Sequence, residues 1–197
     1  MSSEVFLALV AFCFVSSITP GPNNLMLLAS GVNFGFRRSI PHMLGIGSGF
    51  SVLLLCVGAG LGQLIEWSPL LYMALKFAGA AYLLYLAWRI ANSGPLEARD
   101  AAARPMSFFQ AAAFQWVNPK AWVMAVSAMA IYTSAENHLA SVLLVTAIFA
   151  VVNVPSISVW CGLGNGLREF LASPNRLRIF NFTMAGLLVL SLWPMLR

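Results

Sequence analysis

Charged residues are scarce in this sequence. Of its 197 residues, 11 are Lys or Arg and 6 are Asp or Glu, so 9% of the chain is charged, whereas an ordinary soluble domain has about 25% charged residues. Hydrophobic residues make up 60% of the chain, and the mean hydropathy is +0.83. A soluble globule would need more charge to cover its exterior, and a disordered chain would have far fewer apolar residues. The composition therefore predicts an integral membrane protein.

Cysteine and the common catalytic motifs are also scarce. The three cysteines, Cys13, Cys56 and Cys161, each lie alone in an apolar stretch. An odd number without metal-ligand spacing argues against structural disulfides and against a metal site. The sequence has no glycine-rich phosphate loop, paired catalytic carboxylates or Ser/His/Asp set. We therefore expect neither an enzyme nor a bound metal or cofactor.

Long runs without charge are the main feature that the sequence does have. A transmembrane helix needs about 20 mostly apolar residues, whereas the strands of a membrane barrel have about 10 residues of alternating polarity. The helical criterion is met roughly at 5–30, 42–64, 68–89, 108–132, 139–163 and 178–196. The first stretch is too long, and lacks the preceding basic residues, for a cleavable signal. We expect an all-α integral membrane protein with six transmembrane helices, forming a single domain over residues 1–197.

Positive charges fall in alternate loops. The loops after the first, third and fifth stretches carry Arg37, Arg38, Arg89, Arg99, Arg104, Arg168, Arg176 and Arg178. The loops after the second and fourth stretches carry Glu66 and Glu136 instead. Because Lys and Arg in short loops favour the cytoplasmic side, we predict that the basic loops are inside and both termini outside. The net charge of +5 then reflects topology and not a nucleic-acid partner.

The longest linker, the predicted cytoplasmic segment 93–104, divides the chain into repeat halves at about 1–92 and 105–197. The first helix of one half enters from outside and that of the other from inside. The halves therefore form a 3+3 inverted repeat, an arrangement found in many secondary transporters. The first helix of each half is also broken by proline, once in Thr19-Pro20-Gly21-Pro22-Asn23-Asn24 and once in Asn118-Pro119-Lys120.

The two breaks predict a substrate site. In lipid, freed backbone groups are tolerated only where they face protein or a water-filled cavity. A half-helix starting after Pro22 would offer N–H groups and a positive dipole end to an α-carboxylate. Proline kinks that serve only helix packing are the alternative, but two matching breaks, each with Asn, favour a binding site. The predicted substrate-binding residues are Pro20, Gly21, Pro22, Asn23, Asn24, Gln115, Asn118, Pro119 and Lys120.

Besides Lys120, the candidates for coupling or for supporting the site are Lys76, His42, Tyr82 and Asn153. Lys120 lies near the middle of a span, where an ammonium group should face the bundle interior, although it could also extend to the cytoplasmic interface. Lys76 lies nearer the outer end of its stretch, so extension to the interface is favoured there. His42 is a candidate titrating group, but an interfacial histidine without a special role is the favoured interpretation. Asn153, just before Pro155, marks either a local kink or part of the cavity lining.

Two other patterns bear on packing and on the substrate. Gly45, Gly47 and Gly49 have the small-residue spacing that lets helix backbones approach closely, and Gly79 is a further candidate for helix packing. No Asp or Glu lies inside any predicted span. Because a cationic side chain would lack a counter-charge there, we expect a neutral substrate.

Three segments resemble the LysE/RhtB-type amino-acid exporters. They are SSITPGPNNLMLLASGVNFGFRRSIPHMLGIGSG from Ser17, LKFAGAAYLLYLAWRI from Leu75, and FQWVNPKAW from Phe114. The spacing and total length agree over nearly the whole chain. The family's motif residues carry over to Pro20, Gly21, Pro22 and Asn23, to Lys76, Gly79 and Tyr82, and to Asn118, Pro119 and Lys120. The Gly79-to-Trp88 run and Asn23-Asn24 look closest to the cysteine/O-acetylserine exporter branch.

The resemblance implies an exporter of amino acids or their derivatives in the bacterial inner membrane, driven by proton exchange. Its partners would be the amino-acid substrate, protons and the lipid bilayer, and the sequence also allows a homo-oligomer. The substrates would be of the cysteine/O-acetylserine, threonine/homoserine or leucine class.

Other functions remain open on the sequence alone. A membrane thiol–disulfide electron conductor would need two cysteines that can meet, yet the fourth stretch has none. An exporter of basic amino acids would need an intramembrane acid. A purely structural membrane subunit accounts for the apolar stretches but not for the matched breaks.

Overall fold

The structure is a computed structural model that describes residues 2–62, 68–93 and 104–193. Within these ranges all regular secondary structure is helical, which confirms the all-α prediction. Most of the predicted linker 93–104, with Arg99, lies outside the described residues, as does Glu66. The elements are α1 (Ser3–Ile18), α2 (Pro22–Phe34), η1 (Arg37–Ser39), α3 (Ile40–Cys56), the π-helix η2 (Val57–Leu61), α5 (Pro69–Ala91), α6 (Phe108–Phe114), η3 (Gln115–Val117), α7 (Pro119–Tyr132), α8 (His138–Gly166), η4 (Phe170–Ala172) and α9 (Pro174–Leu190).

Proline and capping residues determine where several helices begin. Pro22, Pro119 and Pro174 lie in the first turns of α2, α7 and α9, where the missing N–H costs no hydrogen bond. Ser107 begins α6 with a capping box, in which its Oγ accepts from the backbone N–H of Gln110 at 3.2 Å and its own N–H donates to Gln110 Oε1 at 3.0 Å. The same prolines that interrupt the first and fourth stretches thus restart a helix in each.

The helices follow the predicted stretches, and two of these stretches are each divided into shorter helices. The run Arg37–Leu61 and α8 are long and apolar enough to cross a membrane within the described part of the chain. The pair α1 and α2 adds a third span if it is counted as one, bent by 55° at its break. Stretch 108–132 is likewise divided into α6, η3 and α7. α8 continues unbroken through Pro155, and α9 begins earlier than predicted because Pro174 provides its first turn.

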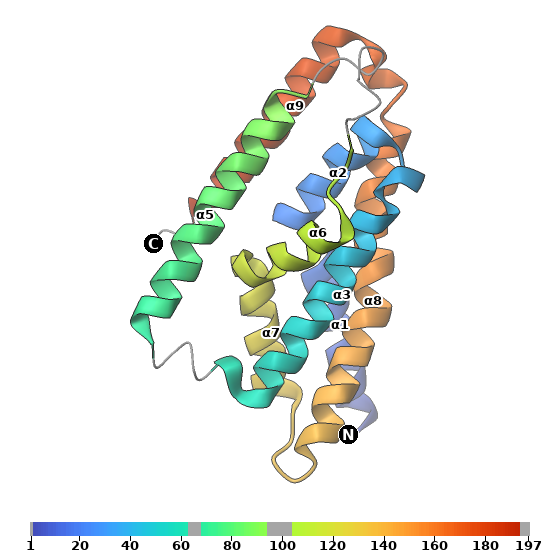
Figure 1. Cartoon of the computed structure of the whole chain (residues 1–197). Coiled ribbons are helices and arrows are strands. Elements are labelled where there is room, and N and C mark those ends of the chain that lie inside the picture. The colour runs from blue at the N-terminus through green and yellow to red at the C-terminus, as the bar shows by residue number, and fades with distance from the viewer. Residues whose placement is uncertain (1, 63–67, 94–103, 194–197) are drawn as a thin grey trace.

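Successive segments run in alternating directions along the bundle (Figure 1). The connections after α2 and α8 and the C-terminal end of α5 lie at one end, whereas the α7–α8 connection lies at the other. We call the first end the basic end, defined by Arg37, Arg38, Arg89, Arg104 and Arg168. Figure 1 also places both helix breaks about midway along the bundle.

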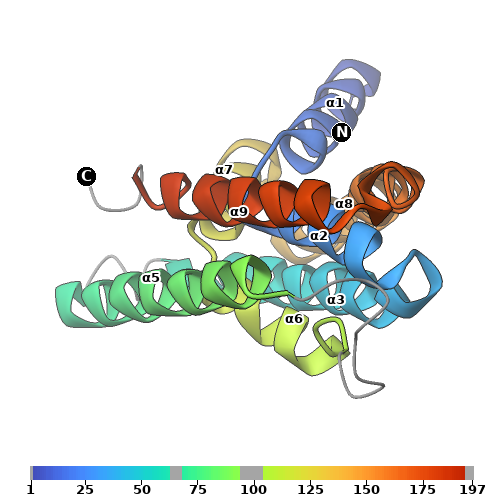
Figure 2. The ribbon, with the colours of Figure 1, turned by 90° about the horizontal axis from the view of Figure 1, so that it is seen from above.

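Each broken helix packs against the long helix of the other half. α1 and α2 contact α8, whereas α6 and α7 contact α3. α3 also contacts α8, and α5 packs against α9 (Figure 2). Each broken helix thus packs against a helix from the other side of the linker in the sequence.

Glycines permit the closest helix contacts. A Cβ atom on Gly45 would overlap the carbonyl oxygen of Phe108, and one on Gly49 would lie 2.5 Å from Ala112 Cα, so both bring α3 against α6. Gly47 faces Val154 of α8 in the same way, at 2.8 Å from its Cγ2. The predicted packing residue Gly79 is buried on α5.

Candidate functional site

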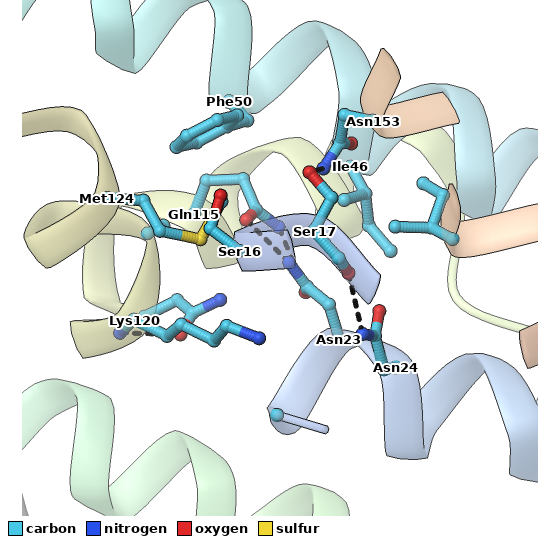
Figure 3. Close-up of a pocket in the computed structure, with 14 residues that line it drawn as sticks. Ser16, Ser17, Asn23, Asn24, Ile46, Phe50, Gln115, Lys120, Met124 and Asn153 are labelled. Carbon is cyan, nitrogen blue, oxygen red and sulfur yellow. Dashed lines mark hydrogen bonds between the residues drawn. The ribbon is translucent and has the colours of Figure 1, made fainter. Parts of the chain in front are cut away.

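A pocket lies where the two broken helices meet, with about 350 Å³ of empty space including its open mouth (Figure 3). Its apolar wall includes Ile46 and Phe50, which belong to two different clusters of the hydrophobic core. The predicted residues that line it are Gly21, Asn23, Asn24, Gln115, Asn118, Lys120 and Asn153. The predicted prolines do not line it. They act on the backbone, where they end and restart the helices.

Asn23 and Gln115 join the two breaks directly. Asn23 Nδ2 donates to Gln115 Oε1 at 2.8 Å, and Gln115 Nε2 donates back to Asn23 Oδ1 at 3.2 Å (Figure 3). Gln115 is completely buried, and its Nε2 also donates to Ala111 O at 2.9 Å. Residues 92 positions apart in the chain thus form one reciprocal amide pair between the halves.

Side chains from other segments satisfy the carbonyl groups at the end of α1. Asn24 Nδ2 donates to Ser17 O at 2.8 Å and to Thr19 O at 2.7 Å. Trp160 Nε1, from α8, donates to Ile18 O at 2.9 Å. The last carbonyl groups of any helix have no partner within that helix, and inside a membrane each unsatisfied group is costly. The break is therefore stabilised by the tertiary structure around it.

Lys120 extends from the second break into the first. Its Nζ donates to Thr19 O at 2.6 Å and to Thr19 Oγ1 at 3.0 Å. A cation at a helix C-terminus is favourable because the exposed carbonyl groups carry partial negative charge. Gly21 leaves room for this side chain, since a Cβ atom there would lie 2.7 Å from Lys120 Cδ. The ammonium group is thus placed at the border of the pocket, between the two halves.

The two half-helix N-termini differ in their capping. Asn118 caps α7, because its Oδ1 accepts from the backbone N–H of Lys120 at 3.2 Å. Gly21 begins α2 without a side-chain cap, and the first intrahelical bond there runs from Leu25 N to Gly21 O. Among the described residues, no side chain caps the backbone N–H groups of Asn23 and Asn24. The start of α2 therefore keeps hydrogen-bond donors and a positive dipole end beside the pocket.

Asn153 adds an acceptor on the opposite wall. Its Nδ2 donates to Ser17 Oγ at 3.1 Å (Figure 3). Its Oδ1 is buried and has no hydrogen-bond partner among the described residues. Because α8 is continuous here, Asn153 contributes to the pocket from an intact helix, which favours the lining interpretation over a local kink.

Three other candidates lie away from this pocket. Lys76 and Tyr82 are half-buried on α5, and the Tyr82 ring packs 5.7 Å from the Phe114 ring. His42 was expected at an interface, but its side chain is only 2% exposed and lines a different pocket. Its burial results from the packing of α3 within the bundle, which its position beside the basic loop does not reveal.

Sequence reasoning missed several residues of the site. Thr19 directly precedes Pro20 and Ser17 lies three residues before it, so the carbonyl groups freed at this break were a signal that could have been used. Trp160 and Phe50 are far away in the chain, and only packing brings them to the break. No Asp or Glu lines the pocket, and the described residues contain no group of His, Cys, Asp or Glu that could hold a metal ion.

Comparisons with known proteins agree with these observations. A family model described as LysE type translocator matches residues 14–192. The chain is 31% identical over 191 residues to the cysteine/O-acetylserine efflux protein of Escherichia coli (strain K12), with 96% of each chain covered. The identity and coverage are the same for the protein of that name from Shigella sonnei (strain Ss046). No solved structure matches.

Proposed function

Because this chain belongs to the LysE type translocator family, we propose that it exports small neutral amino acids or their derivatives across the bacterial inner membrane. The relatives named as cysteine/O-acetylserine efflux proteins make that substrate class our first choice, ahead of the threonine/homoserine and leucine classes. The absence of Asp and Glu from the pocket lining supports a neutral substrate over lysine or arginine, since a cationic side chain would have no counter-charge.

The observation that carries this proposal is the uncapped start of α2 beside the pocket. The substrate carboxylate binds the backbone N–H groups of Asn23 and Asn24, near the ammonium group of Lys120. The substrate ammonium group is received by the unpartnered Oδ1 of Asn153. Donors and an acceptor on facing walls match the two charged ends of a zwitterion.

Transport follows from movement of the two halves against each other. In this proposal six spans form a 3+3 inverted repeat, with the basic loops in the cytoplasm and both termini outside. The Asn23–Gln115 pair and the Lys120–Thr19 contact connect the halves, so they break or exchange as the pocket changes the side to which it opens. A proton gradient drives the cycle, with Lys120 and His42 as the candidate groups for coupling.

Efflux of labelled amino acids from proteoliposomes, with and without a proton gradient, tests the proposal. The panel contains cysteine, O-acetylserine, threonine, homoserine, leucine and lysine. We expect export of the neutral members, stimulation by the gradient, and loss of export in Pro22→Ala and Lys120→Ala at normal expression. Pro174→Ala is the matched control, because Pro174 also starts a helix but lies away from the pocket. Full activity in both site variants would contradict the site assignment.

The orientation is tested separately. Reporter domains that are active only outside the cytoplasm are fused to either end of the chain. We expect both fusions to be active, and activity at neither end would reverse the proposed topology.

A further inference from the structure

A second pocket lies between α2, α3 and α5 near the basic end, with about 480 Å³ of empty space including its open mouth. Its polar lining consists of Ser30, Asn33, His42, Arg89, Ser93 and Arg104. Among the described residues, no carboxylate lines it. The pocket thus combines two guanidinium groups and an imidazole without an acidic partner in its wall.

His42 is the least satisfied polar side chain of this pocket. It is 2% exposed, and neither Nδ1 nor Nε2 has a hydrogen-bond partner among the described residues. Its polar neighbours are bonded within the protein, as Ser30 Oγ lies 2.7 Å from Ser39 Oγ and Asn33 Nδ2 donates to Asn181 Oδ1 at 3.3 Å. Buried polar groups nearly always have partners, so the imbalance at His42 points to a molecule that binds inside the pocket.

The two arginines indicate the charge of that molecule. Arg89 follows Tyr85 by one helical turn, with its guanidinium 5.9 Å from the Tyr85 ring centroid, and Arg104 approaches from the chain before α6. The forked donors of a guanidinium match a carboxylate or a phosphate. Membrane topology accounts for positive charge at this end, but not for two arginines at the rim of a pocket that also contains a buried, unpartnered histidine.

α2 connects this pocket to the central one. Asn23 lines the central pocket, and Met26, Ser30 and Asn33 line the second. These positions are three or four residues apart, so they follow one face of α2. At 1.5 Å per residue, the path from Asn23 to Asn33 is about 15 Å long. A molecule released from the second pocket would therefore meet the start of α2.

We propose that the second pocket is a loading site that binds the α-carboxylate of the substrate on the basic side, through His42, Arg89 and Arg104. The substrate then passes along α2 to the central pocket. This inference rests on the proposed function, because it takes the basic end as the cytoplasmic side of an exporter. A lipid phosphate has similar chemistry, but α2 contributes side chains to both pockets, which favours the carboxylate of a transported molecule.

Counting bound ligands tests the loading site. The purified chain in phosphatidylcholine nanodiscs is incubated with reduced L-cysteine, and native mass spectrometry with equilibrium binding gives the number of ligands per chain. We expect two equivalents for the unaltered protein and one for the Arg89→Gln/Arg104→Gln variant, with the affinity of the second site lowered about tenfold by either single change. L-Cysteinamide, which lacks the carboxylate, should not compete there. Arg178→Gln, the same charge change at an exposed residue outside the pocket, should keep two equivalents.

His42→Leu separates binding from folding. Because neither ring nitrogen has a partner to lose, the variant should unfold at the same or a higher temperature while it loses the second equivalent. A destabilised variant that still binds two equivalents would show a structural histidine and overturn the proposal.

Further arms separate the remaining explanations. Lys120→Gln should lose the central equivalent and keep the loading one. A single equivalent, lost only in Lys120→Gln, would overturn the loading site and leave the proposed function intact, whereas cysteine bound at neither site would overturn both. If the second equivalent is bound in phosphatidylcholine nanodiscs but lost in phosphatidylglycerol nanodiscs, the pocket is assigned to a lipid headgroup and the carboxylate assignment is overturned.

Discussion

Replacement of Asn23 and Gln115 should reveal an energetic coupling between the two halves. Asn23→Leu and Gln115→Met remove the amide groups and keep similar side-chain shapes. Asn23→Leu leaves Gln115 Oε1 buried without a donor, which costs about 1–3 kcal/mol of unfolding free energy. Gln115→Met costs less on this account, about 1 kcal/mol, because Asn23 is half-buried and borders the pocket.

The coupling can be derived from the two hydrogen bonds of 2.8 and 3.2 Å. Side-chain hydrogen bonds inside membrane proteins average about 0.6 kcal/mol in double-mutant cycles, with a maximum near 1.7 kcal/mol. Two parallel bonds therefore predict a coupling of about 1–2 kcal/mol. The double variant should be more stable than the sum of the single effects by that amount, because no amide remains unpaired.

Reversible unfolding in mixed micelles, followed by tryptophan fluorescence, measures the four proteins of the cycle. Asn92→Leu is the matched control for the change of Asn to Leu, because Asn92 is exposed just after α5 and its amide bonds to Trp88 O of that helix. That control should change stability by less than about 0.5 kcal/mol. If the effects of the two site variants add within about 0.5 kcal/mol, the pair does not couple the halves and the reasoning fails.

Three further predictions concern the break, the packing and the cysteines. Asn24→Ala should lower the free energy of unfolding by about 2 kcal/mol, since two carbonyl groups at the end of α1 lose their donor. Asn24→Asp should be destabilised as well, because a carboxylate only accepts hydrogen bonds. Chemical unfolding measures both variants. Gly164→Ala should destabilise the protein by about 1–3 kcal/mol, because the added Cβ would overlap Leu28 O. Gly162→Ala is its control and should be neutral or stabilising, because a Cβ there has nothing within 4 Å. Thermal unfolding compares the two variants. Efflux should survive replacement of all the cysteines by alanine, since they are free and buried or half-buried, whereas its loss at normal expression would favour a thiol–disulfide conductor. The residues replaced are Cys13, Cys56 and Cys161.

Local sequence signals were enough to predict the helices and the places where two of them break. The paired prolines around Gly21 and the Asn118-Pro119 step marked the two breaks, because proline removes a backbone donor and is favoured in the first turn of a helix. A single proline does not decide this by itself, since α8 continues through Pro155. Long uncharged runs had to be helices, because lipid cannot satisfy a backbone that does not bond internally. The predicted breaks and most helix boundaries are accordingly present in the structure.

The contacts that particular side chains make were harder to predict from the sequence. Lys120 stood out as a charge within a span, but the sequence did not indicate that its Nζ would contact Thr19, 101 residues away. His42 looked like an interfacial residue, because its neighbours in the chain are a proline and a basic loop. Its burial, its unpartnered nitrogens and its place in a second pocket depend on α2 and α5, which surround it only in the folded bundle.

By itself, the sequence determined the class of protein, the apolar helices, the position of both breaks and the family signature. These depend on hydropathy, proline geometry and motif spacing, which act over a few neighbouring residues. Only the tertiary structure decided that Gln115 pairs with Asn23, that Asn118 caps one half-helix while the other stays uncapped, and which atoms remain without partners. Hydrogen bonds extend over about 3 Å and depend on direction, so they are decided by how helices distant in the chain come together.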